Sequence, residues 1–132
     1  EKHIIAITES VLARSQGNYA TCQDIADDIK DIFGGKKHIG VVFPILSRNR
    51  FSLLMKGMAR GASKVTVVLS YPSDEVGNGI IDWDKLDENN IDPYKDEFTL
   101  EEWRKIFGIV KHPFTAMDYP GYYKELIESE GA

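Results

Sequence analysis

The fold is decided by residues 38–70, HIGVVFPILSRNRFSLLMKGMARGASKVTVVLS. The two ends of this stretch, residues 38–43 and 64–70, are short apolar runs rich in Val and Ile, a composition typical of buried strands. Four apolar residues between them recur at helical spacing: Phe51, Leu54, Met55 and Met58. Because strand, helix and strand in succession are the pattern of a parallel sheet with a helical crossover, the stretch predicts an α/β fold.

A further strand and helix are expected before this stretch. Residues 3–8, HIIAIT, form another apolar run of strand type. Thr21 and Asp24 have the spacing of a capping box, which predicts the start of a helix that Gly34 ends. The expected architecture is therefore a small parallel sheet of about three strands with crossover helices.

After residue 70 the apolar runs give way to loop-forming residues and short helical patterns. Three short helices are predicted, over residues 82–88, 99–107 and 119–127. We expect a single domain over residues 1–132, with a βαβαβ core in residues 1–70 and loops and short helices in residues 71–132. Three strands are few for a whole α/β domain, so we expect the sequence to be part of a longer chain.

The net charge of −5 is distributed unevenly along the 132 residues. Residues 34–73 contain seven of the 16 Lys and Arg and none of the 21 Asp and Glu, so this interval carries +7 and the remainder carries 9 − 21 = −12. An acidic chain with one cysteine and no apolar run of about 20 residues is not expected to bind nucleic acid, form a disulfide framework or span a membrane. A single cysteine suits a reducing compartment, and we expect a cytoplasmic protein.

The loops after the strands are the first place to look for a binding site. Ligands of open α/β sheets bind beyond the carboxyl ends of the strands, and in a parallel sheet these ends lie at one edge. The loop after residues 38–43 contains Ser47, Arg48, Asn49 and Arg50. Guanidinium, amide and hydroxyl donors at the start of a helix favour a phosphate group, so these four residues are a predicted phosphate site. The alternative is that Ser47 caps the helix and both arginines are solvated or paired with the acidic tail.

Acidic residues follow the other two strands. Asp74 and Glu75 are predicted ligands of Mg²⁺ or Mn²⁺, since hard cations prefer oxygen ligands and often bridge to phosphates. Glu9 and Ser10 would join them from the first loop as substrate-binding residues. The alternative for Glu9 and Ser10 is capping of a short helix, and acidic pairs in surface loops are also common without a metal. No catalytic residue is assigned.

Two further features belong to the helix expected after the phosphate loop. Four polar residues recur every four positions along it and are typical of a solvent-exposed face: Arg48, Ser52, Lys56 and Arg60. Gly57 and Gly61 are interpreted as positions where another element packs closely. Neither feature by itself indicates a ligand.

Several stretches resemble one enzyme family. Residues 4–17 (IIAITESVLARSQG) are similar to the opening strand and turn of the coenzyme F(420)-0:L-glutamate ligase (gamma-glutamyl ligase) family. Three more stretches resemble its divergent branch in Gram-positive bacteria: FPILSRNRF at 43–51, SYPSDEVGN at 70–78, and HPFT at 112–115 with Asp118 and Tyr119.

The resemblance implies a GTP-dependent amide ligase that attaches L-glutamate to a phosphorylated deazaflavin coenzyme through an acyl phosphate. It also implies a divalent metal ion and a homodimer. A ligation on another acid is equally compatible with the residues present. In such a reaction, the convergence of the loops would let Ser47, Arg48, Asn49 and Arg50 hold phosphate, Asp74 and Glu75 hold the metal ion, and Glu9 and Ser10 help to place the substrate.

Two other classes of function remain open on the sequence. One is a non-catalytic regulatory module that binds a nucleotide or a similar anion. The other is a subunit-interface domain in which the apolar face of residues 119–127 meets a partner.

Overall fold

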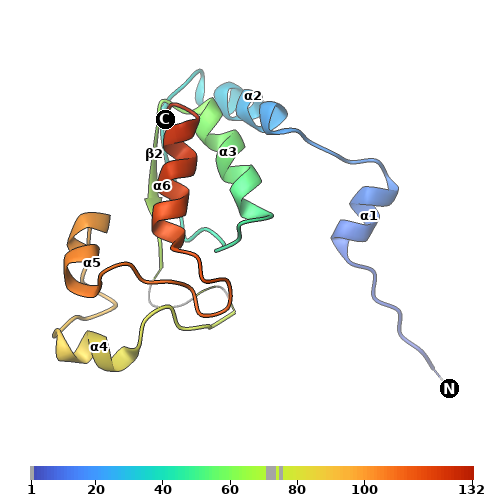
Figure 1. The fold of residues 1–132 in the computed structure, drawn as a ribbon. Coiled ribbons are helices and arrows are strands. Elements are labelled where there is room, and N and C mark those ends of the chain that lie inside the picture. The colour runs from blue at the N-terminus through green and yellow to red at the C-terminus, as the bar shows by residue number, and fades with distance from the viewer. Residues whose placement is uncertain (1, 71–73, 75) are drawn as a thin grey trace.

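The computed structural model describes residues 2–70, 74 and 76–132, and it has an α/β fold with a parallel sheet (Figure 1). The described elements follow in the order α1 Glu9–Ser15, α2 Cys22–Phe33, β1 His38–Val42, α3 Phe51–Gly61, β2 Lys64–Val68, α4 Trp83–Glu88, α5 Leu100–Phe107 and α6 Tyr119–Ser129. The predicted α/β class, the parallel strand pairing and the helical C-terminal segment are confirmed.

The sheet in the described part of the chain consists of β1 and β2, which pair in parallel from His38 opposite Lys64 to Val42 opposite Val68. Alternate residues of both strands point to the same side and pack with α3 and α6. The other side of the sheet is exposed, as is expected of strands whose second face has no covering layer.

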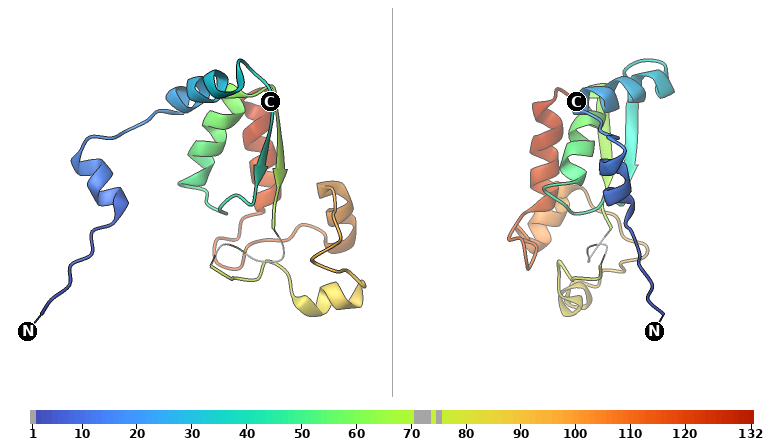
Figure 2. Two further views of the ribbon diagram at one scale, coloured as in Figure 1. Left: turned by 180° about the vertical axis from the view of Figure 1, so that it is seen from behind. Right: turned by 90° about the vertical axis from the view of Figure 1, so that its right-hand side faces the viewer.

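The expected strand over residues 3–8 is wrong for this structure. These residues are extended but lie in no sheet, and Ile4 and Ile5 are 96% and 86% exposed. Figure 2 shows the N-terminal segment and α1 standing away from the strands. An apolar run of strand type predicts that a segment can pair, but it does not specify the edge against which it pairs.

The main core lies between α3, α6 and the inner face of the sheet. Met55 and Ala59 of α3 meet Tyr119, Tyr123 and Ile127 of α6, and all five are buried. The buried part of the face of residues 119–127 is thus occupied within the chain. The subunit-interface role stays a prediction.

Helix α2 packs tightly on α3 because two glycines of α3 lie at the crossing. A Cβ atom on Gly57 would lie 2.7 Å from Cβ of Ile25, and one on Gly61 would lie 2.6 Å from the carbonyl oxygen of Ala26. Both distances are far below van der Waals contact, so the prediction that these glycines permit close packing is confirmed.

Residues 80–110 form a second, smaller cluster that includes α4 and α5. Ile81, Leu86 and Ile91 are its buried members, and Trp103 and Phe107 of α5 pack against them. Figures 1 and 2 show α4 and α5 beyond the end of the sheet at which both strands finish. The described loop that follows β1 therefore lies at the same end of the sheet as this second cluster.

Candidate ligand site at the carboxyl ends of the strands

The turn before α3 is built by Ser47. Its Oγ accepts hydrogen bonds from the backbone N–H groups of Asn49 (3.4 Å) and Arg50 (3.1 Å), and its carbonyl oxygen accepts one from the N–H of Ser52 (3.1 Å). Ser47 therefore closes the turn that precedes α3, but the N-cap residue of α3 is Arg50, not Ser47 as the alternative interpretation expected. The backbone donors of Asn49 and Arg50 are used inside the protein, so a ligand at this turn would be held mainly by side chains.

Those side chains are free in the described structure. Arg48, Asn49 and Arg50 are exposed, and none of the three side chains has a hydrogen-bond or ion-pair partner among the described residues. The acidic tail pairs elsewhere: Glu130 binds Arg60 at 2.8 Å and Lys56 at 3.3 Å. The turn thus presents two unpaired guanidinium groups and an amide at the carboxyl end of β1.

The same ion pairs correct the interpretation of the polar stripe on α3. Ser52 is buried, and Lys56 and Arg60 are bound by the half-buried end of α6 rather than facing only solvent. The hydrogen bond and charge of Arg60 lower the pKa of Glu130 despite the opposing effect of burial, and Lys56 acts in the same direction. A four-residue polar repeat identifies one side of a helix, but it does not show whether another helix lies there.

A tyrosine from α6 holds the turn in place. The Tyr123 hydroxyl donates to the carbonyl oxygen of Ile45 (2.5 Å) and accepts from the backbone N–H of Ser47 (3.0 Å). The Tyr123 side chain is almost fully buried. One buried phenol therefore satisfies two backbone groups of the loop after β1 and ties that loop to α6.

Asp74 lies in the loop after β2 and is buried, with 7% of its side chain exposed. Its Oδ1 accepts from the backbone N–H groups of Val76 (3.0 Å) and Asn78 (2.7 Å), and its Oδ2 accepts from the Asn78 side-chain amide (2.7 Å). His112 Nε2 lies 3.0 Å from the same Oδ2. Burial would raise the pKa of Asp74, but hydrogen bonds from Asn78, His112 and Val76 outweigh it and lower this pKa to about 2.

The surroundings of His112 determine its tautomer. Its Nδ1 accepts hydrogen bonds from the backbone N–H groups of Phe114 and Thr115, both at 3.3 Å. Nε2 therefore carries the ring proton and donates a hydrogen bond to Oδ2 of Asp74. This pair joins the loop after β2 to the segment before α6. The pairing of His112 with Asp74, 38 residues away, had no signal in the sequence.

A chain of contacts connects the two loops. The Tyr119 ring lies 5.6 Å from that of His112, edge to face, and 5.9 Å from that of Tyr123. Ser47 and Asp74 are therefore linked through Tyr123, Tyr119 and His112. The structure brings these two predicted regions to the same end of the molecule, as the parallel sheet required.

The loop that contains Glu9 and Ser10 does not lie at the carboxyl ends of the strands. Glu9 and Ser10 are exposed at the start of α1, in the N-terminal segment that stands apart from the strands (Figure 1). The predicted meeting of three loops is therefore wrong for this one. Glu9 and Ser10 lie in the first turn of α1, whose N-cap residue is Thr8 and whose start has no capping side-chain hydrogen bond, so the capping alternative is not confirmed.

The described residues do not fit the predicted metal site. Both oxygens of Asp74 already accept hydrogen bonds, and Glu75 lies outside the described residues. Among the residues that the structure describes, no three His, Cys, Asp or Glu side chains are grouped to hold a metal ion. The role of Asp74 and Glu75 as ligands of Mg²⁺ or Mn²⁺ stays a prediction.

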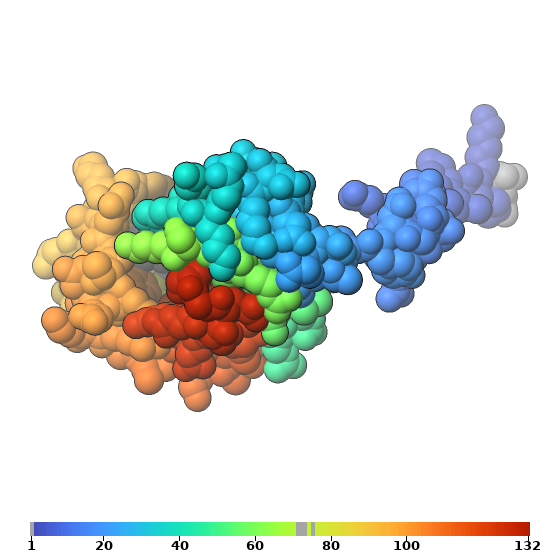
Figure 3. Space-filling view, turned by 90° about the horizontal axis from the view of Figure 1, so that it is seen from above, coloured from blue at the N-terminus to red at the C-terminus, as the bar shows by residue number. Residues whose placement is uncertain are grey.

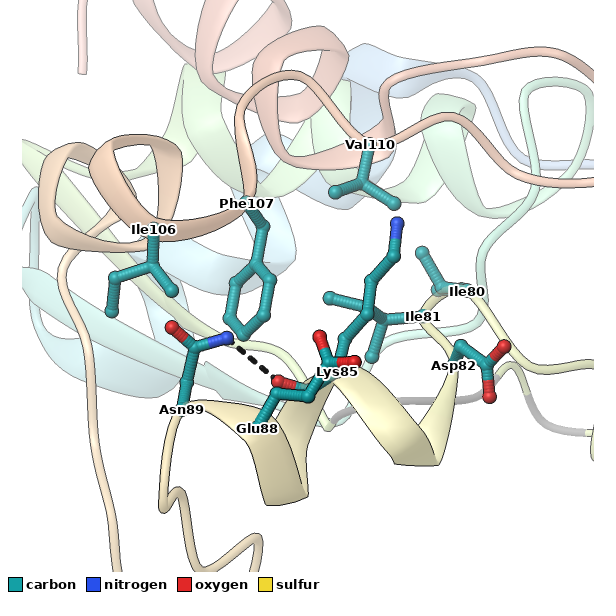
Figure 4. Close-up of a pocket in the computed structure, with 9 residues that line it drawn as sticks. All are labelled: Ile80, Ile81, Asp82, Lys85, Glu88, Asn89, Ile106, Phe107 and Val110. Atoms are coloured by element: carbon teal, nitrogen blue, oxygen red, sulfur yellow. Dashed lines mark hydrogen bonds between the residues drawn. The ribbon is translucent and has the colours of Figure 1, made fainter.

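A cleft of about 300 Å³ lies between α4 and α5 (Figure 4). It is lined by Ile80, Ile81, Asp82, Lys85, Glu88, Asn89, Ile106, Phe107 and Val110. In Figure 4 the Lys85 side chain extends across the opening toward Val110. Its lining comes from two helices about 20 residues apart in sequence, so no local motif indicated it.

None of the helices in the described part of the chain has the length and apolarity that crossing a membrane requires. No curated protein and no solved structure matches the chain. Residues 1–104, more than half of the sequence, match the F420-0:Gamma-glutamyl ligase family profile. This match covers both strands and the turn from Ser47 to Arg50, and on its strength the chain belongs to the F420-0:Gamma-glutamyl ligase family.

Proposed function

We propose that the chain is part of an acid–amino-acid ligase and binds a phosphorylated ligand at the turn from Ser47 to Arg50. Family membership supports the ligase role. GTP is the proposed phosphoryl donor and L-glutamate the proposed amine substrate, because these are the substrates that the resemblance implies. The acceptor is a carboxylic acid, with the phosphorylated deazaflavin coenzyme as one candidate.

The observation that carries the proposal is the pair of unpaired guanidinium groups at the carboxyl end of β1. Arg48 and Arg50 are exposed, and neither has an ion-pair partner within the described chain. Arginine binds phosphate through two parallel N–H···O bonds, which fix the orientation of the phosphate group, and the positive guanidinium offsets part of its negative charge. Asn49 between them adds an amide that can donate to a phosphate oxygen.

The proposed reaction needs charge neutralisation more than it needs a reactive side chain. The γ-phosphoryl group of GTP passes to an oxygen of the acceptor carboxylate, which leaves GDP and an acyl phosphate. The amine of glutamate then attacks the carbonyl carbon, a C–N bond forms, the C–O bond to phosphate breaks, and inorganic phosphate and a proton leave. Phosphoryl transfer of this kind depends chiefly on positioning and on cationic groups around the phosphate oxygens.

A divalent ion, Mg²⁺ or Mn²⁺, belongs to the proposal as a companion of the nucleotide. Mg²⁺ commonly keeps several waters and is held largely by substrate phosphates. Such an ion would arrive with GTP and would not require the saturated carboxylate of Asp74. No step of the proposed reaction is assigned to it.

Isothermal titration calorimetry with GTP and ATP, each with and without Mg²⁺, tests the site. Arg48→Glu and Arg50→Glu are each expected to weaken nucleotide binding by about tenfold or more, because each replaces a charge-assisted donor with a repelling carboxylate. Lys36→Glu is the matched control: it makes the same change of charge just before β1, at the opposite end of the sheet, and is expected to alter affinity less than about twofold.

Unchanged affinity in both arginine variants would remove the turn as the phosphate site. Production of inorganic phosphate when glutamate and an acidic acceptor are supplied supports the ligase. Binding of the nucleotide without any turnover would instead favour the regulatory module, the alternative that the sequence left open.

A further inference from the structure

The cleft between α4 and α5 has an apolar lining that the neighbouring core holds in place. The apolar residues that line it are Ile80, Ile81, Ile106, Phe107 and Val110. Phe107 and Val110 also pack against the buried residues of the second cluster, which fixes their positions. The volume of about 300 Å³ is at the lower end of the range for small-molecule sites, so the cleft suits a ligand of about the size of one amino acid.

The charged side chains of the cleft are not paired with one another. Lys85 comes three residues after Asp82 and three before Glu88, a spacing at which side chains on a helix can meet. The same spacing gives an ion pair of 2.7 Å between Lys30 and Asp27. Lys85 has no ion-pair partner among the described residues, and in Figure 4 its nitrogen points across the opening, away from both carboxylates. The cleft therefore presents one positive and two negative groups that no described side chain of opposite charge neutralises.

The direction of the Lys85 side chain has a simple cause. Its methylene stem can lie over the apolar lining while the ammonium group stays at the opening (Figure 4). Asn89 adds another polar atom, because its side-chain nitrogen donates to the carbonyl oxygen of Lys85 (2.8 Å) and its side-chain oxygen remains an acceptor. The polar side of the cleft thus offers a charged donor next to several acceptors.

An α-amino acid matches these groups better than an ion of one sign. Its carboxylate would pair with Lys85 and its ammonium group with Glu88 or Asp82. A simple carboxylic acid would face two carboxylates of its own sign, and a simple amine would face the Lys85 ammonium. The side chain of the amino acid would lie against the apolar lining, which favours a large apolar side chain. A second carboxylate, as in L-glutamate, would be buried there without a donor.

The cleft is separate from the turn that is proposed to bind phosphate. None of its lining residues belongs to the turn from Ser47 to Arg50. Figures 1 and 3 show α4 and α5 on the opposite side of the molecule from the N-terminal segment, so that segment does not cover the cleft. A ligand could therefore bind in the cleft whether or not the turn is occupied.

We propose that the cleft between α4 and α5 binds a free α-amino acid with a large apolar side chain. Lys85 holds its carboxylate, and Glu88 and Asp82 hold its ammonium group. The apolar lining, with Phe107 and Val110 at its centre of support, holds its side chain. This inference goes beyond the proposed function and does not rest on it.

Titration of the isotope-labelled chain with L-leucine and with L-phenylalanine, followed by two-dimensional NMR, tests the proposal. Saturable shifts of the backbone amides of residues 80–89 and 106–110 are expected for at least one of them, with a dissociation constant of about 1 mM or lower. L-Glutamate is expected to bind at least about tenfold more weakly. Three results would overturn the proposal: no saturable shift with either apolar amino acid up to about 10 mM, shifts confined to other residues, or equal binding of L-glutamate.

Analogues of the two amino acids test the need for both charges. Isocaproate and hydrocinnamate lack the ammonium group, isoamylamine and phenethylamine lack the carboxylate, and all four keep the apolar part. Each is expected to bind at least about tenfold more weakly than its parent amino acid. An analogue that binds as tightly as its parent would show that the cleft does not recognise an amino acid.

Substitutions at the charged residues test the location. Lys85→Gln and Glu88→Gln each replace a charged partner with a neutral amide and are expected to weaken amino-acid binding about fivefold or more. Lys105→Gln and Glu101→Gln are the matched controls, because both residues are exposed on α5 and do not line the cleft. The controls are expected to change affinity less than about twofold. Equal losses in a variant and its control would contradict the assignment, and circular dichroism checks that every variant is folded.

The cleft and the proposed function fail in different ways. Chains that bind nucleotide but neither apolar amino acid would end the inference about the cleft and leave the function intact. Chains that bind L-leucine or L-phenylalanine in the cleft but no nucleotide would end the function and leave the cleft intact.

Discussion

Two polar groups of residues lie at the same end of the sheet and have opposite surroundings. The turn from Ser47 to Arg50 exposes two arginines without ion-pair partners in the described chain, whereas the Asp74–His112 pair is buried and its polar atoms are bound by neighbouring groups. Both looked alike in sequence, as charged loops that follow strands. Side chains that the fold already satisfies hold loops together, and those that it leaves free are available to a ligand.

The largest effect is expected from Asp74→Ala. This change leaves the Nε2–H of buried His112 and the backbone N–H groups of Val76 and Asn78 without their acceptor, so the free energy of unfolding should fall by about 2–3 kcal/mol. Urea denaturation followed by circular dichroism measures it. Asp28→Ala, at an exposed position of α2, is the control and should change stability by less than about 0.5 kcal/mol. Equal losses in the two variants would contradict the structural role of Asp74.

A smaller effect, about 1–2 kcal/mol, is expected from Tyr123→Phe. The ring would stay packed, but the carbonyl oxygen of Ile45 and the N–H of Ser47 would lose their partner. Because this hydroxyl positions the turn, nucleotide affinity should also fall while Arg48 and Arg50 remain unchanged. Tyr94→Phe removes the hydroxyl of an exposed tyrosine and should alter neither quantity. Loss of stability without any loss of nucleotide affinity would show that the position of this turn does not matter for nucleotide binding.

The smallest effect is expected from mild acid. The pKa of Asp74 is lowered to about 2 from an ordinary value of 3.8, so its carboxylate contributes stability that is complete above 3.8 and is lost as the pH falls toward 2. The stability difference between the wild type and Asp74→Asn should therefore be constant from pH 7 to about pH 5 and shrink below about pH 4. Urea denaturation at pH 7, 5 and 3 measures the difference. A difference that is the same at pH 3 as at pH 7 would show that the ionised carboxylate is not the stabilising form.

Local patterns were sufficient for most individual elements. The capping box at Thr21 and the left-handed Gly34 at the end of α2 are both present, because each depends on residues within one turn of helix. The strand runs that became β1 and β2 were also predicted, and so was the close packing at Gly57 and Gly61. These features follow from contacts or conformations that short segments specify themselves.

The candidate site was predicted only in part. The placement of Ser47 to Arg50 and of Asp74 at one end of a parallel sheet followed from the order of elements. Two other features had no local pattern. They are the hydrogen bond between Asp74 and His112 and the hydrogen bonds from Tyr123 to Ile45 and Ser47, which join residues 38 to 78 positions apart.

The sequence by itself determined the positions of β1, β2 and most helices, the parallel direction of the strands and the loops that follow them, since spacing, capping and chirality act locally; the strand expected over residues 3–8 is the exception. Only the tertiary structure decided which of the charged loops is free. That choice depends on which distant groups happen to reach each side chain: Glu130 reaches Lys56 and Arg60, and His112 reaches Asp74, while no described acid reaches Arg48 or Arg50. Hydrogen bonds and ion pairs require contact within a few ångströms, and only the packed chain brings residues so far apart in sequence to that distance.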